Sequence, residues 1–143
     1  MAEAKVLKER PGPMRLADAT QYKLPPSALV SILHRISGLI IAILLLPFVI
    51  WMFDTSVTDE VSFDEFRSAF SAGIGFVPAF VVKLVTLVLL WSFLHHFCAG
   101  LRHLYLDVTH NTTKEVGRST ALGAMGVSLV LTVALGAKLF GLY

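Results

Sequence analysis

The sequence predicts an all-α membrane protein with three transmembrane helices, and two observations carry that prediction. First, 55% of the 143 residues are hydrophobic, only 15% are charged, and the mean hydropathy is +0.72, which is too apolar for an ordinary soluble domain. Second, the apolar residues form three long runs, each able to cross the hydrocarbon core of a bilayer. The formal net charge of +2 is too small to suggest a nucleic-acid partner.

Residues 1–26 are predicted to form a polar, basic N-terminal tail, kept extended by its prolines. The tail lacks the apolar core and small-residue cleavage site of a secretory signal, and it contains acidic residues that transit peptides lack. We therefore expect an uncleaved, multi-pass protein of a bacterial inner membrane. Residues 27–143 are expected to form the three-helix transmembrane domain.

The first span is predicted at about residues 27–53, because Pro26 suits a helix start and no charged residue follows Arg35 before Phe53. Its early turns place Ser31, His34 and Arg35 on roughly one face. Gly38, one turn further, offers a small residue for close helix contact. Pro47 is expected to kink the far end.

Residues 54–77 are acidic, with Arg67 as their single basic residue. Because positive charge favours the cytoplasmic side, the basic N-terminus is predicted to be cytoplasmic and this connection external. Phe63, Phe66 and Phe70 recur at helical spacing, which predicts a short helix on the membrane surface.

The second span is predicted at about residues 78–107 and the third at about residues 115–138. The connection between them is basic and is therefore expected on the cytoplasmic side. Thr112 to Glu115 matches a capping box that would open the third helix. The third span ends at Lys138, so the C-terminus is predicted to be external.

A polar stripe on the second span is the candidate functional feature, because ionisable groups at membrane depth mark functional sites. Imidazole is a normal axial ligand of haem iron. Gly100 of the stripe would leave room for the macrocycle. His103 of the stripe or Arg35 of the first span could hold the haem propionates. At about 100° per residue, the stripe comprises Ser92, His96, Gly100, His103 and Asp107.

The adjacent residues His95 and His96 point about 100° apart, so they cannot ligate the same iron from one helix. A second axial ligand from another chain is the simpler solution. The residues alone are compatible with two roles for His96, either as a haem ligand or as a hydrogen-bonded packing histidine. We expect His95 and His110 to be packing or surface residues.

Two motifs carry a resemblance to a known family. S-I-L-H-R-I-S-G at Ser31 to Gly38, and H-x-x-x-G-L-R-H-L-x-x-D at His96 to Asp107, resemble the cytochrome b subunit of succinate dehydrogenase, a membrane anchor of respiratory complex II. The resemblance covers almost the whole chain. One departure is the segment R-P-G-P-M at Arg10 to Met14, where the family usually has R-P-L-S-P-H; it bears on the path of the tail.

By position, the resemblance implies that His96 is an axial ligand of haem b, with the other ligand from a second anchor subunit. It implies that Ser31 and Arg35 line the ubiquinone site. His34 and His103 match positions near the haem propionates, and His34 is also open to a role as a quinone proton relay. Asp107 would lie at the cytoplasmic edge of the same region.

The implied function is that of a non-catalytic membrane subunit of succinate:ubiquinone oxidoreductase, which with the second anchor holds the flavoprotein and iron-sulfur subunits. The chain has neither a nucleotide-binding glycine motif nor a cysteine set for iron-sulfur clusters, since Cys98 is its single cysteine. One alternative is a fumarate reductase anchor that uses menaquinol. Another is a structural three-span protein without a cofactor, in which the polar stripe only joins helices.

Overall fold

The computed structural model describes residues 23–57 and 60–142, so all but the last four residues of the predicted tail lie outside the described part. The all-α prediction is confirmed. Three continuous helical stretches are long and apolar enough to cross a membrane: Pro26–Val57, Ala79–Thr109 and Lys114–Leu139. The elements are α2 (Pro26–Ile40), the π-helical turn η1 (Ile41–Leu45), α3 (Leu46–Val57), α4 (Glu60–Ser71), α5 (Ala79–Thr109) and α6 (Lys114–Leu139).

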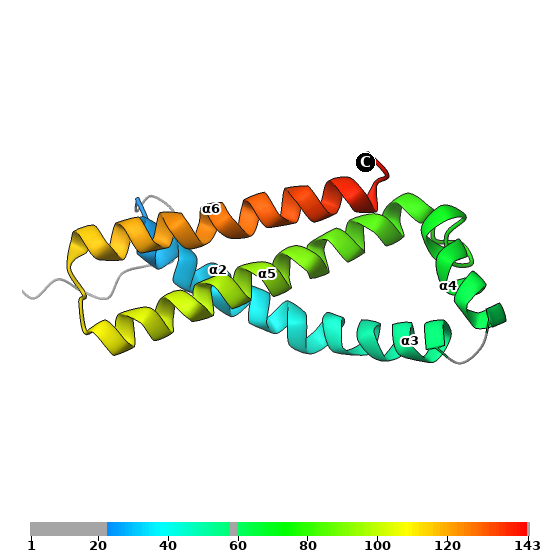
Figure 1. The fold of residues 1–143 in the computed structure, drawn as a ribbon, viewed down its shortest axis with the longest axis horizontal. Helices are drawn as coiled ribbons and strands as arrows, with labels where there is room; N and C mark the ends of the chain where they lie inside the picture. Colours follow the sequence, from blue (N-terminus) through cyan, green and yellow to red (C-terminus); the bar gives the residue numbers. More distant parts are fainter. Residues whose placement is uncertain (1–22, 58–59, 143) are drawn as a thin grey trace, which may run out of the picture.

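The first long stretch is interrupted just before Pro47, where a kink was predicted. In η1 the amide of Leu46 donates to the carbonyl of Ile41, five residues back. Pro47 has no amide hydrogen for the carbonyl of Ile43, and its ring crowds that carbonyl, so the helix widens there. The chain changes direction between α2 and α3 (Figure 1). Beyond η1, α3 packs mainly against α4.

The phenylalanines at helical spacing lie on a helix, α4, which crosses the end of the bundle (Figure 1). Phe66 packs against Trp51 of α3, with ring centroids 5.8 Å apart, and against Phe70 at 5.3 Å. The short helix is therefore confirmed. Its position on a membrane surface stays a prediction.

Helices α2, α5 and α6 pack side by side and form the bundle (Figure 1). The centre of the bundle is built from small side chains, and Val30, Ala99 and Ala121 are fully buried. A Cβ atom on Gly136 would lie 2.7 Å from Cδ1 of Leu87, so α5 and α6 approach closely because glycine stands there. Small residues have this role where helices associate by van der Waals contact in an apolar medium.

The start of α6 differs by one residue from the predicted capping box. The N-cap is Thr113, whose hydroxyl accepts the amide of Val116 at 3.4 Å. The side chain of Asn111 accepts the hydroxyl of Thr113 at 3.2 Å and so holds Thr113 at the cap position. The prediction of Thr112 as the cap is wrong for this reason.

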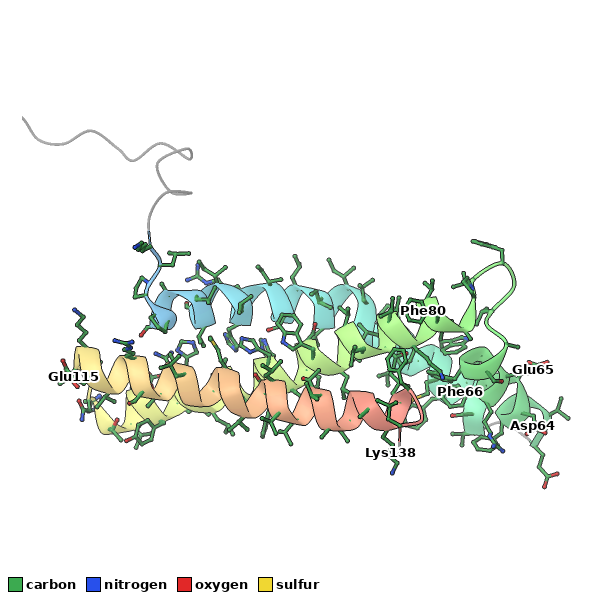
Figure 2. All side chains as sticks on the ribbon, turned by 90° about the horizontal axis from the view of Figure 1, so that it is seen from above. Asp64, Glu65, Phe66, Phe80, Glu115 and Lys138 are labelled. Carbon is green, nitrogen blue, oxygen red and sulfur yellow. The ribbon has the colours of Figure 1, made fainter. Side chains whose placement is uncertain are left out.

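The two ends of the bundle carry different side chains. Glu115 lies at the end where α6 begins, whereas Lys138, Asp64 and Glu65 lie at the opposite end (Figure 2). The histidines that the sequence singled out belong to the half of the bundle that contains the start of α2, the end of α5 and the start of α6.

Candidate functional site

Three imidazoles gather where α2 packs against α5. The ring of His34 stacks on that of His96, with centroids 4.1 Å apart and planes 17° apart. The ring of His34 also approaches that of His103, with centroids 5.2 Å apart. His96 and His103 are about two helical turns apart on α5, so His34 of α2 connects the two.

The hydrogen bonds of His96 determine which of its ring nitrogens is free. Nδ1 lies 3.0 Å from the backbone carbonyl oxygen of His34, which can only accept a hydrogen bond. The proton of a neutral His96 therefore sits on Nδ1, and Nε2 keeps its lone pair. Metal-binding histidines usually have this arrangement, in which the second nitrogen donates to a carbonyl.

Ser37 completes the contacts of His96, and its side chain is fully buried. Its hydroxyl donates to the carbonyl of His34 at 2.9 Å, and its oxygen lies 3.3 Å from Nδ1 of His96. The carbonyl of His34 thus receives two donors. Ser37 belongs to the quoted motif, yet sequence reasoning gave it no role; its signal is the spacing of three residues from His34, which places both on one face of α2.

The close approach of the two helices depends on Gly38. A Cβ atom there would lie 2.9 Å from Cε1 of His96 and 3.3 Å from its Nδ1, so a side chain would push the imidazole away. Gly100 has a different neighbour from the predicted one. The space beside it adjoins the ring of His34, whose Nε2 would be 3.7 Å from a Cβ on Gly100. The ring next to Gly100 is therefore an imidazole of its own chain, at ordinary van der Waals distance.

Ser31 and Arg35 lie one turn apart on α2, with Ser31 half-buried and Arg35 exposed. Most helical serines bond back to their own helix, as Ser37 does. Within the described part of the chain, neither the hydroxyl of Ser31 nor the guanidinium of Arg35 has a hydrogen-bond or ion-pair partner. Both donors are therefore without a partner among the described residues. Asp107, also in the predicted region, is exposed on the last turns of α5.

His95 faces the other side of α5, toward α6. It is only 2% exposed, its Nδ1 lies 3.2 Å from the hydroxyl oxygen of Ser128, and its ring stacks on Trp91. The prediction of a packing residue is confirmed. His110 is exposed at the C-terminal end of α5, in agreement with the prediction of a surface residue.

The donor set fits one axial position of haem iron. Among the described residues no group of three or more histidine, cysteine, aspartate or glutamate side chains could hold a metal ion. His34 cannot serve opposite His96 on one iron, because their rings lie face to face and not end to end across a shared atom. The neutral imidazole of His96, with Nε2 bare, fits a haem whose second ligand comes from elsewhere.

Comparison with known proteins places the chain in a family. The model of the succinate dehydrogenase/fumarate reductase transmembrane subunit matches residues 8–135. The chain is 29% identical over 119 residues to the succinate dehydrogenase cytochrome b556 subunit of Coxiella burnetii, covering 83% of this chain and 90% of the relative. It is 28% identical over 114 residues to the subunit of the same name from Paracoccus denitrificans, covering 78% and 80%. The chain therefore belongs to the succinate dehydrogenase/fumarate reductase transmembrane subunit family and is a membrane-anchor subunit.

Proposed function

We propose that this subunit binds haem b against the α2–α5 interface, with Nε2 of His96 as one axial ligand and the other from a second membrane-anchor subunit. The observation that carries the proposal is the hydrogen bond from Nδ1 of His96 to the carbonyl of His34, at 3.0 Å, which leaves Nε2 unprotonated. The names of the relatives as cytochromes b556 support the choice of cofactor. Bound haem supplies one-electron redox chemistry.

The proposed roles of the two other imidazoles follow from their contacts. The rings of His34 and His103 approach each other, and both side chains are half-buried, so each could donate to haem propionates. A role of His34 as a proton relay to the quinone is the second possibility for that residue. Its position one turn from both Ser31 and Gly38 on α2 is compatible with either role.

We further propose that Ser31 and Arg35 contribute donors to a ubiquinone site shared with the other subunits. Reduction of a quinone places developing negative charge on its carbonyl oxygens, and donors that lack internal partners are suited to stabilise it. The unpaired hydroxyl of Ser31 and the unpaired, exposed guanidinium of Arg35 meet that requirement among the described residues. Arg35 would supply a fixed positive charge, and Ser31 a directional hydrogen bond.

In the complex, this subunit and the second anchor would hold the iron-sulfur and flavoprotein subunits on the cytoplasmic face of a bacterial inner membrane. The basic residues of the connection between α5 and α6, and the acidic residues around α4, favour a cytoplasmic N-terminus and an external C-terminus. The relatives named succinate dehydrogenase favour succinate oxidation over the alternative of fumarate reduction with menaquinol. Analysis of the quinone that co-purifies with the native complex distinguishes the two.

The haem proposal is tested by the reduced-minus-oxidised visible spectrum of the whole purified complex carrying His96→Ala. We expect the haem b bands to be lost or strongly altered, because the substitution removes the proposed ligand nitrogen. The matched control is His110→Ala, which removes an exposed imidazole beyond the last turn of α5 and should leave the bands unchanged. Unchanged bands in His96→Ala would place the ligand elsewhere, and no bands in the native complex would favour a purely structural anchor.

The quinone proposal is tested by two activities of the same complex: succinate oxidation with ubiquinone and with a water-soluble dye. Arg35→Gln should lower ubiquinone reduction by about 100-fold, in the range for loss of a donor to a developing oxyanion, while dye reduction stays unchanged. Ser31→Ala should act in the same direction with a smaller effect. Lys138→Gln, at the opposite end of the bundle, is the charge control. An equal fall in both activities would mean that the complex fails to assemble, which contradicts a role specific to quinone.

A further inference from the structure

Arg102 is a buried cation without a counter-charge in the described part of the chain. Its side chain is 8% exposed, Nε donates to the hydroxyl of Thr120 at 3.2 Å, and Nη2 donates to the carbonyl of Gly117 at 3.2 Å. Both acceptors are neutral. Burying a charge costs free energy unless an opposite charge compensates it. An anion from outside the described residues would therefore stabilise the buried guanidinium.

A cavity of about 550 Å³ lies beside this guanidinium, between the start of α2, the end of α5 and the start of α6. Arg102, Lys114 and Arg118 all line it, and Pro26 and Leu106 contribute apolar surface. Lys114 and Arg118 are exposed and have no ion-pair partner among the described residues. The first turn of α6 also borders the cavity, which adds the positive end of a helix dipole to the three cations.

The depth of the cavity relative to a bilayer follows from the neighbouring uncharged runs. The uncharged part of α5 extends from Leu84 to Leu101 and ends at Arg102. The uncharged part of α6 begins at Ser119, directly after Arg118. The cations of the cavity therefore mark the level at which both helices pass from apolar to polar surroundings, which is the level of lipid headgroups.

We propose that this cavity binds the phosphate headgroup of an anionic phospholipid. The phosphodiester would compensate the charge of Arg102, whose planar guanidinium suits phosphate oxygens, and Lys114 and Arg118 would approach it from the rim. The glycerol and the first acyl carbons would pack against Pro26 and Leu106. The cavity is separate from the three imidazoles of the candidate haem site, because it adjoins the α5–α6 contact and is not lined by His34, His96 or His103.

The test measures binding of spin-labelled phosphatidylglycerol to the purified, delipidated complex, with phosphatidylcholine of the same acyl chains as the neutral competitor. Arg118→Gln should weaken phosphatidylglycerol binding by about fivefold, which is the loss expected for one interfacial cation. The double variant Lys114→Gln/Arg118→Gln should weaken binding by about 25-fold, because it removes two such cations. Lys138→Gln removes one cation from the far end of the same helix and should leave binding unchanged. Arg102→Gln should abolish binding; if it prevents assembly, the Arg118 and Lys114 variants decide.

Four outcomes would overturn the proposal. Equal competition by phosphatidylcholine would mean that the negative headgroup is not recognised. Unchanged binding in the double variant would place the lipid elsewhere. Displacement by inorganic phosphate at millimolar concentration would assign the cavity to a free anion. Binding that appears only after removal of the iron-sulfur subunit would assign the cavity to a protein interface.

Discussion

The two faces of α5 use adjacent histidines in opposite ways. On the α2 side, His96 donates from Nδ1 to a backbone carbonyl and stays half-buried. On the α6 side, His95 is 2% exposed and bonds to the hydroxyl of Ser128. Its Nε2 is buried and has no hydrogen-bond partner in the part of the chain that the structure describes. One imidazole is open to an external ligand, whereas the other is enclosed by its own chain.

The difference lies in what faces each histidine. Gly38 lets the half-buried ring of His96 lie close to α2, where its Nδ1 bonds to the carbonyl of His34. On the other side, Ala99 and Ala121 bring α5 and α6 so close that His95 fills their contact. The identity of a residue in a membrane helix therefore says less about function than the closeness of the helix opposite. The predictions that follow test this contrast between the two faces.

The largest effect on haem binding is expected from Gly38→Ala. The added Cβ would lie 2.9 Å from Cε1 of His96, so the ring must move. Overpacking of this kind costs about 1–3 kcal/mol, which would lower haem affinity by about fivefold or more. The haem-to-protein ratio of the purified complex measures it. Gly123→Ala, where a Cβ meets nothing within 4 Å, is the control and should retain full haem. Full haem in both variants would contradict the idea that haem binding depends on the close contact between Gly38 and the ring of His96.

On the opposite face of α5, His95→Ala should destabilise the anchor without changing the haem bands. Removing a buried ring leaves a cavity, and large-to-small changes in packed interiors cost about 2–5 kcal/mol. Thermal unfolding of the complex measures the loss, and the visible spectrum of the folded fraction reports the cofactor. Loss of the bands from folded protein would show that the two faces of α5 do not act independently.

The smallest effect is expected from Ser37→Ala. The carbonyl of His34 still accepts Nδ1–H of His96, so the ligand keeps its tautomer and haem remains bound. The hydroxyl that shares this carbonyl is lost, and the change of one hydrogen bond, about 1 kcal/mol, corresponds to a shift of about 40 mV in the haem midpoint potential. Redox titration of the complex measures it. Ser92→Ala, which loses only a bond to its own helix, should leave the potential unchanged.

The helical class, the three apolar stretches and the polar stripe of α5 could be predicted because helix periodicity and span length are local properties of sequence. Sequence reasoning also separated His95 from His96, since their angular difference is set by the helix itself. It could not identify Ser37 or Arg102 as important. Their roles depend on partners in another helix, the ring of His96 for Ser37 and the carbonyl of Gly117 for Arg102. The capping-box pattern indicates Thr112, because the effect of Asn111 on the cap is not visible in such a pattern.

The local pattern of the sequence indicates which residues lie in apolar helices and which face of α5 is polar, because backbone hydrogen bonding is satisfied within each helical segment. Contacts between helices were needed to show that a carbonyl of α2 fixes the proton of His96, that the ring of His34 lies beside Gly100, and that Arg102 is buried without a counter-charge in the described chain. These features depend on distances of a few ångströms between helices. Such distances are set by small residues on both partners, and no single segment encodes them.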